Sequence, residues 1–447
     1  MAEAATSPPA RPIRIGNCSG FYGDRLSAMR EMLDGGRLDV LTGDYLAELT
    51  MLILGRDRLR DPALGYARTF PRQLEDCLGT ALEAGVRIVS NAGGLNPEGL
   101  ASRVAEIAAA QGLSPRIAYV DGDDVRALGA DLRVDGETAE APLTANAYLG
   151  GSGIAHALAA GADVVVTGRV TDASLVTGPA RWWHGWPATA YDELAGATVA
   201  GHVLECGCQA TGGNFSGFAA SALIAGAARP LGFPLAEIAA DGSSVITKHE
   251  RTGGVVSLDT VTAQLLYEVS SAAYLGPDVT THLGSVSLHG DGPDRVGISG
   301  VRGTAPPEQL KVCTNRLGGH RNAVELVLTG LDVEEKAAWV RRQLEPLLTA
   351  SRVTWTLGPL PTPDAETEEA ASTVLRCVVR DPSPEPVGRA FGAAVVELAL
   401  ASYPGFTMTA PPGDGTSYGV YRAGFVDRAL VTQRVHVLGG DSQVVAL

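Results

Sequence analysis

Short apolar runs recur along the first part of the chain, and each is followed by a polar, glycine-containing loop and then by a helical pattern. The runs are Ile13 to Cys18, Leu38 to Thr42, Val86 to Ser90, Ile117 to Val120 and Asp163 to Thr167. Strands that alternate with helices pair in parallel, because each helix carries the chain back across the sheet. We therefore predict neighbouring parallel strands at Ile15, Leu41, Val89, Ala118 and Val165. The fold class expected is α/β, with a mostly parallel sheet flanked by helices and a smaller α+β C-terminal region.

The chain of 447 residues exceeds what one hydrophobic core usually organises. We expect a large α/β domain over residues 13–350, with a subdomain break near 145–230, and a small α+β region over residues 371–447. The stretch 359–369 between them is rich in Pro, Thr and acidic residues and is typical of a linker. Within the large domain, GFPLAEIAADG (232–242) indicates a short helix and turn.

Composition excludes some classes of function. A net charge of −15, from 35 Lys and Arg against 50 Asp and Glu, leaves no basic stripe for nucleic acid. The start, MAEAATSPPARP, lacks the pattern of a signal peptide, and no apolar stretch is long enough to cross a bilayer. The expected location is the cytoplasm, where the six scattered cysteines stay reduced, and no membrane or nucleic-acid partner is expected.

Ligands of open α/β sheets bind outside the carboxyl ends of the strands, so the loops there are candidates for a site. The candidate substrate-binding residues in the first three loops are Asn17, Ser19, Gly20, Asp44, Asn91, Gly93 and Gly94. Such a loop and the helix after it can also be an ordinary β–α turn. The first loop is not G-x-G-x-x-G, and no GK[ST] motif occurs, so no nucleotide site is predicted.

The loop after Thr167 carries Gly168, Arg169 and Asp172. Arginine there would hold an anionic group, and aspartate would orient the arginine or move a proton. We expect this loop to be open to solvent, so replacing Arg169 with alanine should weaken substrate binding more than folding. The alternative is that Arg169 and Asp172 are a structural pair with no substrate.

Two later stretches add candidates. The first carries Glu205 and Cys206 as catalytic candidates, followed by Gly212, Gly213 and Asn214. The second carries Lys248, a further candidate to hold an anion, with Gly253 and Gly254. Cys206 and Cys208 are separated by one residue, which is not zinc-site spacing, so no metal is predicted; a nucleophilic Cys206 stays an alternative. We expect Asn17, Asn91, Arg169, Asp172, Glu205 and Lys248 to face one cleft.

Two features suggest association into a homo-oligomer. Trp182, Trp183 and Trp186 form a dense aromatic patch that suits core, lid or subunit contact. The segment PPGDGTSYG (Pro411 to Gly419) is too rich in Gly and Pro for regular structure and suits a loop over a cleft or a subunit contact.

An ordered series of motifs resembles the acyclic terpene utilisation (AtuA) family. The motifs are GNCSGFYGDR, NAGGLNPEGL, GADVVVTGRVTDASL, GHVLECGCQATGGNFSGF, TGGVVSLDTVTAQLLYEV and YLGPDV. The family is typically encoded beside enzymes that carboxylate and hydrate acyl-CoA, so the resemblance implies acyl-CoA or branched-carboxylate metabolism. The family's lysine loop usually reads K-P-P-G-T-G-G, whereas here Lys248 precedes His-Glu-Arg-Thr-Gly-Gly, and Ser271 to Ala273 stand where an Asp-Pro pair commonly precedes the tyrosine.

These observations favour an enzyme that acts on a branched carboxylate or acyl-CoA thioester by acid–base chemistry, of the hydratase, lyase or isomerase type, without a redox cofactor. Coenzyme A would enter only as part of the substrate. Two alternatives stay open. One is a non-catalytic subunit that binds acyl-CoA or presents it to a partner, and the other is a thiol-dependent hydrolase that uses Cys206.

Overall fold

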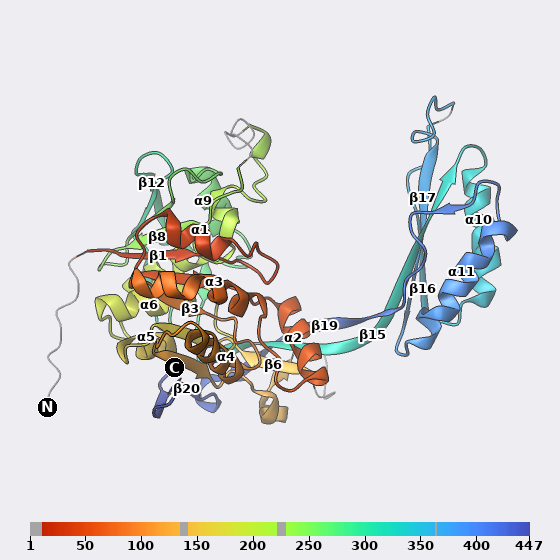
Figure 1. Ribbon diagram of the computed structural model, residues 1–447. Helices are drawn as coiled ribbons and strands as arrows, with labels where there is room; N and C mark the ends of the chain where they lie inside the picture. Colours follow the sequence, from red (N-terminus) through yellow and green to blue (C-terminus); the bar gives the residue numbers. More distant parts are fainter. Residues whose placement is uncertain (1–10, 135–141, 221–228, 363) are drawn as a thin grey trace, which may run out of the picture. The chain divides into compact units, whose positions relative to one another are not determined.

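The computed structural model describes residues 11–134, 142–220, 229–362 and 364–447. The chain forms two compact units (Figure 1). Unit 1 runs to Asn315 and takes up the chain again from Tyr421 to Leu447, and unit 2 is Arg316–Val420. No helix in the described ranges combines the length and apolarity needed to cross a membrane. The predicted domain limits at 350 and 371 stay a prediction.

A block of parallel strands forms the centre of unit 1. Its members, in spatial order, are β1 (Ile13–Asn17), β2 (Val40–Gly43), β3 (Arg87–Ser90), β7 (Val164–Thr167) and β4 (Ile117–Asp121). All four neighbouring pairs are parallel. This confirms the predicted parallel neighbours. The strands are short, apolar and buried on both faces, which is the pattern of a parallel sheet covered by helices.

The prediction of a mostly parallel sheet was wrong for the sheet as a whole. It has 11 strands, and antiparallel strands extend the parallel block at both edges. Beside β1 lie β8 (Pro234–Ile238), β9 (Ser244–Lys248), β13 (Val296–Ser299) and β12 (Ser287–Gly290), and beside β4 lie β20 (Gln433–Val437) and β21 (Ser442–Val445). Six of the ten neighbouring pairs in the described sheet are therefore antiparallel. The helix expected in 232–242 is instead the buried strand β8.

Helices cover both faces of this sheet. One apolar core holds α1 (Ala28–Gly35), α3 (Thr69–Glu83) and α4 (Pro97–Ala110) against one face. A second core holds α5 (Ser152–Ala159), α6 (Ser174–His184), α7 (Tyr191–Glu205) and α9 (Leu258–Leu265) against the other. Val164 and Val166 belong to the first core and Val165 to the second, as the alternation of side chains along a strand requires. Trp186 is buried in the second core, and Trp182 and Trp183 pack against it.

Smaller elements complete unit 1. Helix α2 (Glu48–Arg60) follows β2, and β6 (Thr144–Ala147) pairs with β15. A separate antiparallel sheet consists of β10 (Ala273–Leu275), β11 (Thr280–His282) and β14 (Arg302–Thr304). The long strand β15 (Gln309–Thr329) and the returning strand β19 (Thr416–Asp427) both cross the boundary between the units, and β5 (Arg133–Val134) pairs with β19.

Unit 2 is an antiparallel sheet with two helices. Strand β17 (Ser372–Asp381) lies between β15 and β16 (Arg352–Leu357), and β18 (Thr407–Met408) pairs with β15. Helices α10 (Val333–Leu344) and α11 (Arg389–Ala401) pack on one face of this sheet through an apolar core of their own (Figure 1).

Candidate functional site

A cavity of about 850 Å³ lies in unit 1, beside the carboxyl ends of three parallel strands. Gly20, Asp44 and Arg169 line it, and they follow β1, β2 and β7 respectively. The C-terminal end of α7 contributes Glu205, and Tyr274 comes from β10. The volume falls within the range of small-molecule sites, at the position where open α/β sheets bind ligands.

Acidic side chains dominate the charge of this cavity. Its carboxylates are Asp24, Asp44, Glu48, Asp172, Glu205 and Glu268. Arg169 and Lys311 are its cationic lining residues, and His202 is a third basic group. The cavity therefore has more carboxyl groups than cations, and several of those carboxyl groups can hold protons if burial raises their pKa.

Arg169 is a buried cation at the base of the cavity, with a side chain only 2% exposed. One of its terminal nitrogens lies 2.5 Å from the Asp172 carboxylate and 3.4 Å from the Leu46 carbonyl oxygen. The guanidinium carbon lies 4.2 Å from the centre of the Tyr148 ring, and the Nε atom has no hydrogen-bond partner in the described chain. Burial opposes the charge, but Asp172, Tyr148 and then Asp44 outweigh it, and the pKa of Arg169 is raised.

The loop that carries Arg169 is fixed by a buried carboxylate beneath it. The Arg169 backbone N–H donates to the Asp123 carboxylate at 2.9 Å, and the Asn146 side chain donates to the same oxygen at 2.7 Å. A side chain at Gly168 would collide with Asp123, which explains the glycine at that position. The expectation that this loop is open to solvent was therefore wrong for Arg169.

Asp44 is held by an amide from the neighbouring loop. Asn91 donates to its carboxylate at 2.6 Å, and the backbone N–H of Leu46 donates to it at 3.1 Å. Burial raises the pKa of Asp44 well above its ordinary value, and the nearby Asp172 adds to this effect, whereas Arg169 and Asn91 oppose it. Asn91 also accepts from the Tyr45 backbone at 2.8 Å, so it links the two loops.

Glu205 and His202 form a buried pair on one face of α7, separated by one helical turn. His202 Nδ1 lies 3.0 Å from Glu205 Oε1, while Glu205 Oε2 and His202 Nε2 have no hydrogen-bond partner among the described residues. Burial raises the pKa of Glu205, and the charge of Asp172 adds to this. Burial would lower the pKa of His202, but Glu205 raises it overall. Glu205 thus lines the cavity with one oxygen held by His202 and a second, buried oxygen without a partner among the described residues.

A tyrosine that also lines the cavity packs against this pair. The Tyr274 ring lies 5.3 Å from the His202 ring. Burial raises the pKa of Tyr274 well above its ordinary value, and Glu205 and Asp172 raise it further. Its hydroxyl group therefore stays protonated and can donate a hydrogen bond.

Cys206 lines the cavity next to Glu205, where Gly20 packs against its backbone with room for no side chain. Burial raises the pKa of the Cys206 thiol far above its ordinary value, and Glu205 raises it further. A nucleophilic cysteine needs the opposite shift, because the thiolate is the reactive form.

The predicted site residues divide into two groups. Those that line the cavity are Gly20, Asp44, Arg169, Asp172, Glu205, Cys206, Gly213 and Asn214. Those outside the lining are Asn17, Ser19, Asn91, Gly93, Gly94, Gly168, Gly212, Lys248, Gly253 and Gly254. Asn17 and Asn91 support the site from behind: Asn17 donates to the Leu204 carbonyl oxygen at 2.6 Å and so holds the end of α7.

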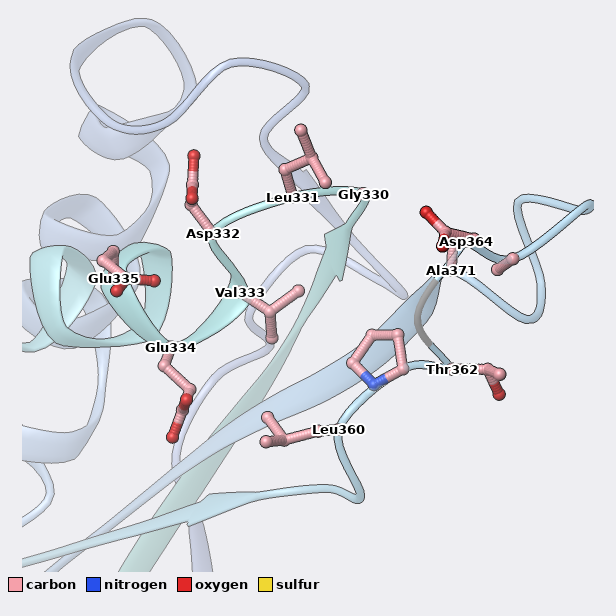
Figure 2. A pocket seen from close by; sticks show the side chains of 12 residues that line it. Gly330, Leu331, Asp332, Val333, Glu334, Glu335, Leu360, Thr362, Asp364 and Ala371 are labelled. Atoms are coloured by element: carbon pink, nitrogen blue, oxygen red, sulfur yellow. The ribbon is translucent and has the colours of Figure 1, made fainter.

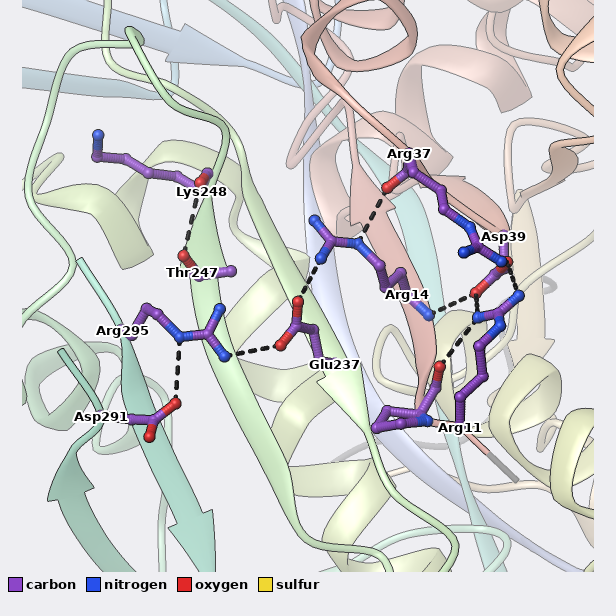
Figure 3. Close-up of polar contacts among 10 residues, drawn as sticks. Arg11, Arg14, Arg37, Asp39, Glu237, Thr247, Lys248, Asp291 and Arg295 are labelled. Carbon is purple, nitrogen blue, oxygen red and sulfur yellow. Dashed lines mark hydrogen bonds and ion pairs between the residues drawn. The ribbon is translucent and has the colours of Figure 1, made fainter. Parts of the chain in front are cut away.

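Lys248 has a different role from the one predicted. Its ammonium group lies 3.1 Å from the Asp294 carboxylate and donates to the Thr252 carbonyl oxygen at 3.2 Å. Figure 3 shows its side chain beside, but outside, a chain of ion pairs in which Glu237 joins Arg14 and Arg295. The structure thus makes Lys248 a link between loops. Of the six residues expected in one cleft, Arg169, Asp172 and Glu205 line the cavity, and Lys248, Asn17 and Asn91 do not.

Several polar lining residues escaped the analysis of the sequence, and among them are Tyr148, His202, Tyr274 and Lys311. His202 has a signal in the sequence, since it precedes Glu205 by three residues and shares its helix face. Lys311 and Tyr148 have no such signal. They reach the cavity because backbone pairing joins the start of β15 to the segment after β6, where the Tyr148 N–H donates to the Lys311 carbonyl oxygen at 2.9 Å.

Unit 2 has a shallow hollow of about 410 Å³ near the start of α10 (Figure 2). Its charged lining residues are Asp332, Glu334, Glu335 and Asp364. No cation or histidine belongs to its described lining, so it lacks the paired acid and base of the cavity in unit 1. Nowhere in the described ranges are three or more His, Cys, Asp or Glu side chains grouped to hold a metal ion.

The fold and cavity define an α/β protein with a ligand-sized, carboxylate-rich site built around a buried arginine. The chain belongs to the acyclic terpene utilisation family, described as "Acyclic terpene utilisation family protein AtuA", whose model matches residues 13–437. This confirms the resemblance seen in the sequence motifs. A comparison with curated proteins finds no match.

Proposed function

We propose that this protein is an enzyme that moves a proton on a branched carboxylate or acyl-CoA thioester, in a reaction of the hydratase, lyase or isomerase type. One observation carries the proposal. Glu205 is a buried carboxyl group at the cavity with one oxygen bound by His202 and the other without a partner among the residues that the structure describes. An orienting partner on one oxygen leaves the second oxygen free to take or give a proton.

The environment of Glu205 suits that role. A general base or acid works best when its pKa lies near the working pH, and burial raises the pKa of Glu205 in that direction. His202 Nδ1 lies 3.0 Å from Oε1 and fixes the orientation of the carboxyl group. In the proposed reaction, Glu205 Oε2 takes a proton from the carbon next to the substrate carbonyl and returns it to the product.

Two groups are suited to the negative charge that develops on the substrate's carbonyl oxygen. Arg169 provides a buried positive charge at the cavity, and Tyr274 provides a hydroxyl group that stays protonated. Charges and donors fixed in advance stabilise an enolate-like oxygen without reorganisation. Lys311, which also lines the cavity, replaces Lys248 as the second cation for an anionic substrate. These reactions transfer no electrons, so no redox cofactor belongs to the proposal.

The proposal also covers the location of the protein, its partners and its assembly. The acidic balance of the chain, with a net charge of −15, suits a small-molecule enzyme of the cytoplasm better than a nucleic-acid partner. The proposed assembly is a homo-oligomer. A non-catalytic acyl-CoA binding subunit would use the same cavity but would show binding without turnover. A hydrolase acting through Cys206 would lose activity on thiol alkylation, and the raised pKa of that thiol disfavours it.

The test is exchange of the α-proton in D₂O. The purified full chain is incubated with branched acyl and enoyl thioesters of coenzyme A, and deuterium uptake is followed by mass spectrometry. We expect Glu205→Gln to reduce exchange by about 10²- to 10⁴-fold, the usual contribution of a general base. Glu237→Gln is the matched control, because Glu237 is also partly buried and paired but lies outside the cavity lining, and it should leave exchange unchanged.

The outcomes separate the three functions. Equal exchange by wild type and Glu205→Gln would refute the assigned role of Glu205. Tight thioester binding by wild type without exchange or release of product would favour the binding subunit. Release of free coenzyme A that stops after alkylation, and persists in Glu205→Gln, would favour the thiol hydrolase.

A further inference from the structure

We propose that four apolar side chains at the cavity form a collar that binds the apolar chain of an elongated, amphipathic ligand. The collar consists of Phe21, Tyr267, Leu275 and Phe425. The polar head of the ligand would then occupy the charged end near Arg169 and Glu205. The identity of that head rests on the proposed function, whereas the collar rests on the exposure and position of its own residues.

The collar residues share two properties. All four line the cavity, and all four are solvent-exposed: Phe21 by 55%, Tyr267 by 42%, Leu275 by 66% and Phe425 by 40%. They come from four separate segments, namely the loop after β1, the end of α9, strand β10 and strand β19. Exposed apolar residues that are scattered singly need no explanation, but a group around one cavity marks a binding surface.

Three charged residues of the same cavity have the opposite property: Asp44 is 4% exposed, Arg169 2% and Glu205 8%. The other charged lining residues are less buried, and Glu268 and Lys311 are exposed. The cavity therefore combines a buried, charged end with an exposed part that holds the four apolar side chains. A ligand that matches this arrangement has a polar head and an apolar chain, and its head enters first.

The reverse orientation is unfavourable at both ends. An apolar chain against Asp44, Arg169 and Glu205 would remove water from charged groups without replacing its hydrogen bonds. A polar head at the collar would leave Phe21 and Leu275 in water. The apolar chain of the bound ligand is thus the occupant that accounts for the collar, because the collar and the charged end line one continuous cavity of ligand size.

The test uses two series of straight-chain probes, n-alkanoates and n-alkanols of four to about ten carbons, titrated calorimetrically into the full-length protein. The collar predicts that the dissociation constant falls with each added methylene group in both series, by up to about fourfold. In the double variant Phe21→Ser/Leu275→Ser this dependence on chain length should be reduced to less than half, with the shortest alkanoate bound as in the wild type. Leu400→Ser is the control, because Leu400 is fully exposed in unit 2.

The result that would overturn the collar is affinity in both series that does not change with chain length, or a dependence that the double variant retains in full. In that case another occupant, such as a partner protein, would be the better explanation of these four residues. If alkanoates bind no tighter than alkanols of equal length while the dependence persists, the collar stands and the proposed anionic head group fails. The two proposals therefore fail separately.

Discussion

Replacing Arg169 with alanine should lower the free energy of unfolding of unit 1 by about 3 kcal/mol. The change removes a buried positive charge from between two carboxyl groups. Asp172 loses a partner at 2.5 Å, and Asp44, which is 4% exposed, loses the cation that opposes its raised pKa. The ring of Tyr148 also loses its contact with the guanidinium group.

The size of this loss in unfolding free energy depends on how deeply Arg169 and Asp172 are buried. Removing one partner of a fully buried ion pair costs about 3 to 5 kcal/mol, because the other charge is left uncompensated. Asp172 is 27% exposed, so water can partly solvate it after the change, and the lower end of that range applies. An exposed pair offers the comparison: Arg302 and Asp192 lie 2.6 Å apart but are 70% and 41% exposed. Arg302→Ala should therefore cost about 0 to 1 kcal/mol.

The destabilisation by Arg169→Ala should also depend on pH. Burial raises the pKa of Asp44 in the folded protein, and losing Arg169 raises it further. A carboxyl group whose pKa is raised by folding stabilises the fold below its unfolded pKa, and this contribution is lost as pH rises through the folded pKa. The variant should therefore be more strongly destabilised at about pH 8 than at about pH 5, where Asp44 can take up a proton.

The assay is urea unfolding read by hydrogen exchange in peptides from β2, β3 and β7, which report on unit 1 alone. A loss below about 1 kcal/mol for Arg169→Ala, comparable to that of Arg302→Ala, would refute the reasoning. So would a loss that is the same at both pH values.

The remaining predictions concern neighbouring groups and assembly. Asn91→Ala should cost about 2 to 3 kcal/mol in the same assay, because it leaves the buried Tyr45 N–H without its acceptor and removes one of the hydrogen bonds to the buried Asp44 carboxylate, and a loss below about 1 kcal/mol would contradict this. Burial raises the pKa of Asp123 to about 7, so wild-type stability should fall as pH rises toward and through that value, and Asp123→Asn should flatten this dependence; equal profiles would contradict it. Glu268 has a φ of 60°, which glycine adopts more readily, so Glu268→Gly should raise stability by about 0.5 to 1 kcal/mol, and a loss of stability would contradict this. Light scattering at micromolar concentration should give a dimer or tetramer, and a monomer would contradict the predicted association.

The parallel centre of the fold could be predicted from the sequence because its signal is local. Each strand there is a short apolar run followed at once by a loop and a helix, and that order requires parallel pairing. The antiparallel edges lack such a signal. β8 was predicted as a helix because its residues, PLAEI, suit either structure when isolated, and pairing with β1 and β9 decides the outcome. Strand β15 gains its length from partners far away in the chain, including β6 and β17.

The site residues also divide into those with a local signal in the sequence and those placed by distant segments of the chain. Asp44, Arg169 and Asp172 were predictable because they directly follow central strands, whose carboxyl ends meet at one edge. Lys248 is the last residue of β9, which is antiparallel to its neighbours, so the loop after it does not join that edge. The burial of Arg169 was not predictable, because Leu46 and Tyr148 contact it from other loops and only the folded chain brings them there.

The pH dependence of α-proton exchange tests the central claim, that Glu205 is a general base in the cavity, most directly. The base must be unprotonated, and burial raises its pKa, so exchange by the wild type should rise with pH through an apparent pKa above that of an ordinary glutamate. Glu205→Gln should abolish that rise, while Glu237→Gln should keep it unchanged. A rise that persists in Glu205→Gln with the same apparent pKa would contradict the claim.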